Sequence, residues 1–209
     1  MRMPETKNSN SVFAHRGFWD SKNEQNSLAS FQNAIKQGFS IETDIRQFAD
    51  KLIISHDSPQ APLPLKLLDL IGTHTTFALN IKEDGLQNHL NSIRFWIEET
   101  NSFVFDGSIP EMHRFHKLGL PHALRLSEFE KSLPWKSDVV WVDSFIEDWW
   151  VNDTFIQQQL DDSRIIIVSP ELHGRDPRFV WDFLAKHQFH GNSNFSICTD
   201  KPVEYLAWS

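Results

Sequence analysis

Short β-rich runs alternate with helical patterns along nearly all of this chain of 209 residues, and few folds accommodate such an order. The alternation is typical of repeated β-α-β units, in which parallel strands form one sheet. Runs such as VVWV and RIIIV lack polar alternation, as expected for strands buried on both faces. The expected strands are Val12–His15, Ile41–Arg46, Phe77–Lys82, Phe103–Phe105, Ala123–Leu126, Val139–Asp143, Ile165–Val168 and Ser196–Cys198, with a hairpin arm at Leu52–Ser55. Eight principal strands predict an α/β fold, a closed (β/α)8 TIM barrel.

The segments between these strands predict helices that pack one apolar face on the sheet. Apolar residues recur at helical spacing in Ser27–Lys36 and in Leu86–Glu98. Pro110 stands where a helix should begin, and Gly38 and Gly119 stand where left-handed caps should end helices. The crossover after the fifth strand and the final PVEYLAWS are short. We therefore expect a small barrel with reduced helices.

Composition favours one soluble domain. No repeat, linker or low-complexity stretch divides residues 1–209, and only residues 1–10 are expected to be flexible. The formal charge of −8 argues against nucleic acid or an anionic membrane as the main partner. The segment MRMPETKNSN lacks the apolar core of a signal peptide, and no apolar run approaches the roughly 20 residues of a membrane span, so we expect a cytoplasmic location. The single cysteine, Cys198, excludes an intramolecular disulfide.

Polar residues end nearly every expected strand, Asp106, Asp143 and Asp200 among them, and catalytic groups in a (β/α)8 barrel stand at these ends. Glu42 and Asp44 are two residues apart on an extended segment, so both carboxylates face the same side. Without a cation they would repel each other, whereas a hard divalent ion such as Mg²⁺ or Ca²⁺ would bind both. The alternative is an exposed pair on an edge strand.

Two histidines and two cations at strand ends could supply acid–base catalysis and phosphate binding. His15 and His56 suit a general base and a general acid because imidazole titrates near neutral pH. The alternative is that they are hydrogen-bonded structural groups. Arg16 and Lys82 suit a phosphate clamp, Arg through its planar fork and Lys as a point charge. Their alternative role is surface solvation.

The loop after the seventh principal strand carries Glu171 and His173, which a barrel would place over its mouth. Substrate recognition is the functional interpretation, and a hydrogen-bonded loop anchor is the alternative. Trp19, Trp149 and Trp150 could stack on a sugar or a lipid-like group, or they could cover the core.

The motifs over residues 13–57 carry a family resemblance when they are taken together. FAHRGFW, QNSLASFQNAIKQGF and SIETDIRQFADKLIISHD resemble the glycerophosphodiester phosphodiesterase family, part of the wider group that includes phosphatidylinositol-specific phospholipases C. That family has His-Arg-Gly, then Glu-Asn-Thr or Glu-Asn-Ser opening a helix, then Glu-x-Asp and His-Asp, in this order and at similar separations. The ending ICTDKPVEYL resembles the family's last strand and turn, which carry Thr-Asp-x-Pro.

The resemblance implies a metal-dependent phosphodiester hydrolase that acts on a small-molecule phosphodiester. It implies that His15 and His56 form an acid–base pair and that Glu42 and Asp44 bind Mg²⁺ or Ca²⁺. It also implies that Arg16 and Lys82 contact the phosphate. Two alternatives stay open. One is a barrel that binds a phosphodiester or phospho-sugar with weakened catalysis, and the other is a lyase that releases a cyclic phosphate.

Two departures from the family pattern bear on the metal site and on the helix-opening motif. Asn80 stands where the family has a third metal-binding Glu, two residues before Lys82. Its neutral amide oxygen can still ligate, so we include it in the metal set, but the site loses one negative charge unless a neighbour such as Asp106 contributes. Gln25 stands at the place of the Glu in Glu-Asn-Thr. The segments FDGSIPE, WVDSF and SPELHGRDP do not match the glycerol-specific enzymes, which leaves the alcohol groups open.

Overall fold

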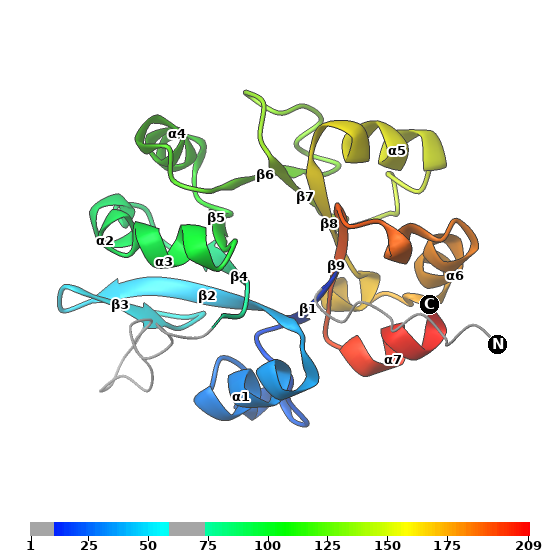
Figure 1. Cartoon of the computed structure of the whole chain (residues 1–209), viewed down its shortest axis with the longest axis horizontal. Coiled ribbons are helices and arrows are strands. Elements are labelled where there is room, and N and C mark those ends of the chain that lie inside the picture. Colours follow the sequence, from blue (N-terminus) through cyan, green and yellow to red (C-terminus); the bar gives the residue numbers. More distant parts are fainter. Residues whose placement is uncertain (1–10, 59–73) are drawn as a thin grey trace.

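A ring of parallel strands forms the centre of the molecule (Figure 1). The structure is a computed structural model that describes residues 11–58 and 74–209. The parallel strands are β1 (Val12–His15), β2 (Ser40–Phe48), β4 (Phe77–Ile81), β5 (Phe103–Phe105), β6 (Ala123–Leu126), β7 (Val139–Val142), β8 (Arg164–Val168) and β9 (Phe195–Thr199). The hairpin arm β3 (Lys51–Ile54) pairs antiparallel with β2. The (β/α)8 TIM barrel prediction is confirmed.

The ring is nearly closed, with one weak seam. Neighbouring strands follow the order β5-β4-β2-β1-β9-β8-β7-β6. Between the two ends of this order, β5 and β6, the described pairing is an isolated parallel bridge from Val104 to His122. The amide of Val104 also donates a hydrogen bond of 3.1 Å to the carbonyl of Pro121. The seam is therefore held by far fewer backbone bonds than the other strand pairs.

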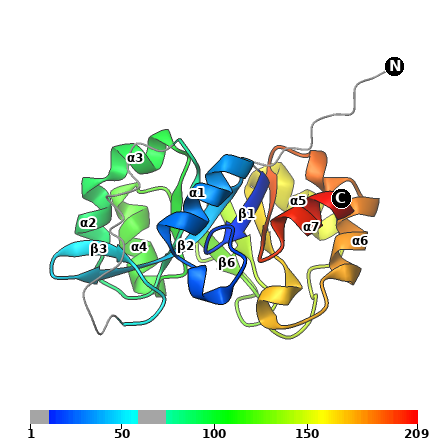
Figure 2. The same cartoon turned by 90° about the horizontal axis from the view of Figure 1, so that it is seen from below.

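Helices cover the outside of the ring (Figures 1 and 2). In chain order they are α1 (Leu28–Gln37), α2 (Gln87–Ser92), α3 (Arg94–Glu99), α4 (Ile109–Leu118), α5 (Asp153–Asp162), α6 (Arg178–Lys186) and α7 (Pro202–Trp208), with short 3-10 turns at η2 (Lys22–Glu24), η4 (Pro170–His173) and η5 (Phe189–Gly191). The described residues 127–138, between β6 and β7, contain no helix. The expectation of reduced helices is confirmed there and in the short α7.

The helix ends follow the expected local chemistry. Ser27 caps α1 by accepting a hydrogen bond from the Ser30 amide at 3.1 Å, and Gly38 ends the helix with a left-handed φ of 77°. Pro110 lies in the first turn of α4, and Gly119 ends that helix at φ 64°. At each of these caps the sequence alone identified where the helix begins or ends.

The expectation of one helix over Leu86–Glu98 is wrong. The segment forms two helices, α2 and α3, which are separated at Ile93, where the backbone leaves helical geometry at φ −110° and ψ 15°. The Ser92 hydroxyl donates to the carbonyl of His89 at 2.6 Å. Such a local side-chain bond competes with the helical ladder, which accounts for the break.

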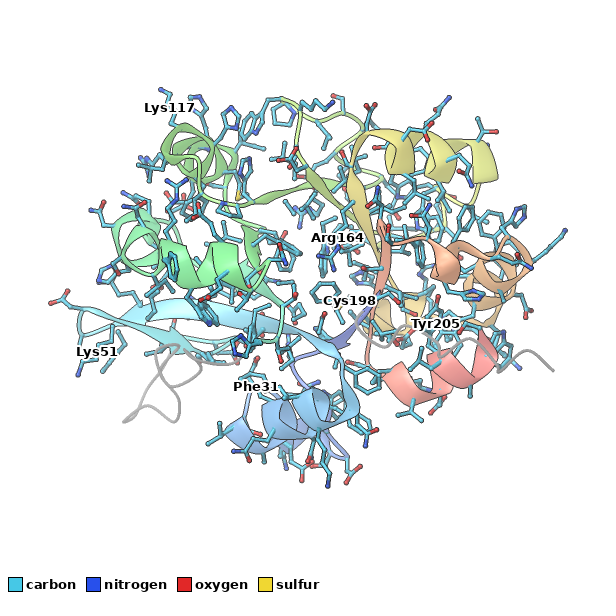
Figure 3. All side chains as sticks on the ribbon, viewed as in Figure 1. Phe31, Lys51, Lys117, Arg164, Cys198 and Tyr205 are labelled. Atoms are coloured by element: carbon cyan, nitrogen blue, oxygen red, sulfur yellow. The ribbon has the colours of Figure 1, made fainter. Side chains whose placement is uncertain are left out.

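Strand periodicity divides the buried side chains into two sets. One set packs between strands and helices, and the other fills the barrel, where Phe13, Phe103, Trp141, Ile166 and Cys198 belong to one buried cluster. Figure 3 shows Cys198 and Arg164 near the middle of the ring. Arg164 opens β8, so its guanidinium, 5.2 Å from the Phe13 ring centroid, lies at the amino end of the barrel. At the other end the inward positions include several polar residues.

None of the helices in the described part of the chain has the length and apolar character that a membrane crossing requires. The expectation of flexibility for residues 1–10 concerns a segment outside the described residues.

Candidate active site

A cavity of about 230 Å³ lies at the carboxyl ends of the strands. Because inward positions recur every second residue, each parallel strand except β9 contributes a side chain to the lining of this cavity. The lining residues come from nearly every part of the ring: His15, Arg16, Glu42, Asn80, Lys82, Phe105, Asp106, Arg125, Trp141, Asp143, Phe145, Val168, Leu172 and His173. Five of the eight residues predicted for the site, namely His15, Arg16, Glu42, Asn80 and Lys82, are among them.

His15, at the end of β1, is oriented by Asp200, which follows β9. The distance from His15 Nδ1 to Asp200 Oδ1 is 2.7 Å, and His15 Nε2 lies 3.8 Å from Glu42 Oε2. Burial alone would lower the pKa of His15, but the hydrogen bond with Asp200 and the charges of Glu42 and Asp200 outweigh burial and raise it. In the neutral imidazole, an Nδ1–H donated to Asp200 leaves Nε2 as a proton acceptor.

The turn after β1 is strained. Arg16 has a left-handed φ of 57°, and its amide donates to the carbonyl of Glu42 at 2.9 Å. Gly17 follows with φ 90°, and a Cβ at that position would lie 2.4 Å from Ser30 Oγ. Non-glycine residues held in this region often belong to functional sites. The turn directs the Arg16 side chain towards β2 and into the cavity wall.

Asp44 holds the two predicted phosphate-binding cations together. Arg16 Nε lies 2.9 Å from Asp44 Oδ2, and Lys82 Nζ lies 3.1 Å from Asp44 Oδ1. Asn26 Nδ2 also donates to Asp44 Oδ2 at 2.8 Å. Burial alone would raise the pKa of Asp44, but the charges of Lys82 and Arg16 and the hydrogen bond from Asn26 keep it below its ordinary value. Gln25 accepts from Arg16 Nη1 at 3.3 Å, so this departure from the family motif supports the same arginine.

Glu42 and Asn80 offer oxygen atoms that suit a hard divalent cation. Burial, followed by the charge of Asp44, raises the pKa of the Glu42 carboxyl. Asn80 Oδ1 is buried and has no hydrogen-bond partner among the described residues. In the same part of the chain, no group of three or more His, Cys, Asp or Glu side chains is arranged to hold a metal ion. An amide ligand from Asn80 would therefore have to complete a set with Glu42 and Asp44, and such oxygen ligands fit Mg²⁺ or Ca²⁺.

His56 does not join His15 in the cavity. It follows the hairpin arm β3, its side chain is 48% exposed, and its Nδ1 lies 2.8 Å from Asp57 Oδ1. Arg46 Nε donates to the His56 carbonyl at 3.0 Å. The structure therefore places this histidine beyond the residues that line the cavity. Its catalytic role stays a prediction.

Glu171 makes the contacts of a loop anchor. Its carboxylate accepts hydrogen bonds from the Ser169 hydroxyl, from the Thr199 hydroxyl and from the Asp200 amide, the last at 3.2 Å. It thereby fixes Asp200, the residue that orients His15. Substrate binding by Glu171 stays a prediction, because its oxygens are used within the protein and it does not line the cavity.

The three tryptophans brace the loops of the mouth. Trp19 Nε1 donates to the His15 carbonyl at 2.9 Å, and Trp149 Nε1 donates to the Asp143 carbonyl at 2.8 Å. Trp150 is buried. These contacts are those of side chains that support the loops and the core, and not those of a platform on which a ligand stacks.

Several residues of the cavity were not among the predicted site residues. The Asp143 carboxylate accepts a hydrogen bond from His173, with 2.7 Å between Asp143 Oδ1 and His173 Nε2. Arg125 forms ion pairs with Asp106 and Glu130. Asp143 and Asp106 were visible as polar residues at strand ends. Arg125 was detectable only as an inward position of the apolar run ALRL, a signal too weak to assign without the sheet register.

The chain is similar to known proteins in its fold, whereas comparisons of its sequence find no match. No family model matches the chain, and no curated protein sequence matches it. Solved structures do match. A glycerophosphodiester phosphodiesterase from Agrobacterium tumefaciens str. C58 is 15% identical, with a TM-score of 0.70 over 95% of this chain and 98% of that chain. The enzyme of the same name from Thermotoga maritima is also 15% identical, with a TM-score of 0.65 over the same shares of the two chains.

The chain has the fold of the glycerophosphodiester phosphodiesterases. A Ca²⁺-dependent phosphatidylinositol-specific phospholipase C from Streptomyces antibioticus shares this fold, at 10% identity and a TM-score of 0.55 over 95% of each chain. The resemblance seen in the motifs is thus confirmed at the level of the fold. In this phosphodiesterase fold, the cavity with His15 lies at the carboxyl ends of the strands, where (β/α)8 enzymes carry their active sites.

Proposed function

We propose that the protein is a phosphodiester hydrolase of the glycerophosphodiester phosphodiesterase type that acts on a small-molecule phosphodiester. The observation that supports this most directly is the composition of one cavity, which combines a His15–Asp200 pair with the cations Arg16 and Lys82. Solved structures of the same fold bear the name glycerophosphodiester phosphodiesterase, and this agrees with the proposal.

The phosphate group binds beside Asp44 in this proposal. Arg16 and Lys82 are held there by one carboxylate, so they are placed before the substrate arrives. Arg16 uses Nε for Asp44 and Nη1 for Gln25, which leaves further N–H donors for phosphoryl oxygens. A guanidinium fork and an ammonium group together suit a phosphodiester anion.

His15 removes the proton from the attacking hydroxyl. In the proposed first step, a substrate hydroxyl next to the phosphodiester attacks phosphorus and its proton passes to His15 Nε2. The hydrogen bond from Nδ1 to Asp200 stabilises the imidazolium that forms. A second group protonates the leaving alkoxide, and His56 has that role in the sequence prediction. Water then opens the cyclic phosphate with the roles reversed.

A divalent cation belongs to this proposal as a cofactor. Glu42, Asp44 and Asn80 would hold it, and when bound it would stabilise negative charge on the phosphoryl oxygens. Glu42 and Asn80 both line the cavity beside Arg16. Burial and the charge of Asp44 raise the pKa of Glu42 despite the nearby His15, and a bound cation would offset both causes.

Hydrolysis assays test this function. The purified protein is incubated with glycerophosphodiesters and with glycerol 4-nitrophenyl phosphate, which all carry a hydroxyl next to the phosphodiester. The incubations contain EDTA or added Mg²⁺, Ca²⁺ or Mn²⁺, and His15→Ala is measured beside the wild type. Turnover that depends on a cation and falls by about 10² or more in the variant is the expected result. Unchanged turnover in His15→Ala would remove the mechanism. Accumulation of a cyclic phosphate would identify the lyase instead. Binding of the phosphodiester without turnover, with turnover restored by Asn80→Glu, would identify the barrel with weakened catalysis.

A further inference from the structure

A second histidine–aspartate pair stands in the same cavity. His173, at the end of η4, places Nε2 2.7 Å from Asp143 Oδ1, and Asp143 directly follows β7. Both residues line the cavity that contains His15. The pair repeats the arrangement of His15 with Asp200, since each imidazole is held by one carboxylate through one ring nitrogen.

The two pairs face each other across the barrel. Going round the ring from β1, the next strands are β9, β8 and β7, so Asp143 stands three strands away from His15 in a ring of eight. Displacement at phosphorus has the attacking and leaving oxygens roughly in line. A proton acceptor and a proton donor are therefore needed on opposite sides. His56 follows β3, which pairs with β2 next to β1, and it does not line the cavity.

The loop that carries His173 is fixed from both sides. Glu171 bonds to Ser169, Thr199 and the Asp200 amide, as described above. Arg175 Nη1 lies 2.7 Å from Asp148 Oδ1, and Arg175 Nη2 donates to the Ser144 carbonyl at 2.9 Å. The ring of Phe145 packs against the imidazole, with 4.9 Å between centroids. A side chain held this firmly is suited to proton transfer, because little reorganisation is needed.

One ring nitrogen of His173 is left for a ligand. Nε2 faces Asp143, and among the described residues no hydrogen bond is formed by Nδ1. The His173 side chain is 23% exposed and lines the cavity. In the imidazolium form, Nε2–H bonds to Asp143 while Nδ1–H is available to an oxygen in the cavity.

We propose that His173, oriented by Asp143, protonates the leaving alkoxide. This inference rests on the proposed function and replaces His56 in the role that the sequence motifs assign to it. The new bond forms between the attacking oxygen and phosphorus while the proton of that hydroxyl passes to His15. The bond between phosphorus and the leaving oxygen breaks, its electron pair stays on that oxygen, and the Nδ1 proton of His173 neutralises it.

The charged groups near His173 suit its role as a proton donor better than a role as a cation that binds phosphate. Asp143 is in direct contact, while Asp106 and Arg125 line the adjoining wall and pair with each other. On its own loop, Glu171 and Arg175 are engaged by other partners.

Dependence on the leaving group tests the proposal. 4-Nitrophenolate leaves without protonation, whereas the alkoxide of a glycerophosphodiester needs a proton. We expect His173→Ala and His173→Gln to lower kcat on a glycerophosphodiester by about 10² or more, while kcat on glycerol 4-nitrophenyl phosphate, which keeps the attacking hydroxyl, changes less than about threefold. An equal loss on both substrates would indicate a structural role and overturn the proposal. His56→Ala is measured in parallel, and a loss confined to the alkyl substrate in that variant would also overturn it.

Two further measurements separate proton donation from positioning. In the wild type, kcat/KM on the alkyl substrate should fall at alkaline pH as the donor loses its proton, and that limb should disappear in His173→Gln. Asp143→Asn should show the same preference for the aryl substrate as His173→Ala. The exposed His113→Ala serves as the matched control, with unchanged activity. If the wild type hydrolyses neither substrate, the proposed function fails together with this inference, whereas an active wild type with an unselective His173 variant contradicts this inference alone.

Discussion

At the scale of single residues, polar side chains in and around the cavity orient one another through successive contacts. Glu171 accepts from the Asp200 amide, Asp200 contacts His15, and His15 Nε2 faces Glu42. A change at any one of these positions therefore alters the imidazole as well as its own contacts. The same logic applies to Arg16 and Lys82, which share the carboxylate of Asp44.

Asp200→Asn should lower kcat by at least about tenfold, because an amide no longer fixes the tautomer of His15 or stabilises its imidazolium. KM should change little, since Asp200 does not line the cavity. Steady-state kinetics on a glycerophosphodiester measures both constants. Lys201→Ala, at an exposed neighbouring position, is the control. A variant with wild-type kcat would show that Asp200 does not act on His15.

Gly17→Ala should destabilise the protein by about 2 kcal/mol or more, because it combines backbone strain at φ 90° with a clash against Ser30. Gly85→Ala is the matched control, since its φ is 100° but nothing lies within 4 Å of the added Cβ. That control should cost about 1 kcal/mol. Urea denaturation measures both. An equal loss of unfolding free energy in the two variants would mean that Ser30 moves away from the added Cβ without a free-energy penalty.

At the scale of elements, a buried carboxylate joins a helix to a loop. Glu111, in the first turn of α4, is fully buried and accepts from the amides of Gly85 and Leu86 at 2.9 and 3.1 Å. These amides belong to the connection between β4 and α2, so one side chain fixes two successive βα units. Arg114 pairs with the same carboxylate at 2.8 Å from a more exposed position.

Glu111→Ala should lower the free energy of unfolding by about 2 to 4 kcal/mol, because two amides lose their acceptor in a buried place. Glu111→Gln keeps a carbonyl oxygen and should lose distinctly less. Equilibrium denaturation of both variants gives the comparison. If glutamine costs as much as alanine, the ion pair with Arg114 rather than the two amides carries the stabilisation.

At the scale of the whole molecule, the seam between β5 and β6 is the weakest part of the ring. His122, which bridges to Val104 there, accepts a hydrogen bond from Trp135 Nε1 at Nε2 over 3.1 Å, and its Nδ1 lies 2.9 Å from the Leu120 carbonyl. Acceptance of the Trp135 N–H needs the neutral imidazole, whereas Nδ1–H can donate to Leu120 in either form. Burial lowers the pKa of His122 below its ordinary value of 6.5, and the charge of His116 acts in the same direction.

Acid should therefore loosen the seam. A histidine whose pKa is lower in the folded state contributes its full stability above pH 6.5, and this contribution is lost as the pH falls below that value. Between pH 7.5 and 5, the urea midpoint of the wild type should fall more than that of His122→Gln, which cannot take up the proton. Protection of the Val104 amide from hydrogen exchange should fall with it. Parallel pH profiles for the two proteins would contradict this assignment.

Local patterns in the sequence were sufficient to predict most strands and helices and to predict that the site lies at the carboxyl ends of the strands. The strands at Val12–His15 and Phe103–Phe105 have the predicted bounds, because burial on both faces leaves a run of apolar residues that is readable without neighbours. Alternation along β2 also indicated that Glu42 and Asp44 face one side. The helix break at Ile93 escaped prediction because a single side-chain hydrogen bond outweighed a clear apolar period.

The partners across the barrel depended on the tertiary structure. His15 and Asp200 are 185 positions apart, and Asp143 and His173 are 30 apart, so no local period relates them. Arg16 and Lys82 share Asp44 because the ring brings their strand ends together. The same arrangement leaves His56 outside the cavity. Residue spacing determines which face of a strand a side chain occupies, whereas ring closure and loop anchoring determine which side chain it meets.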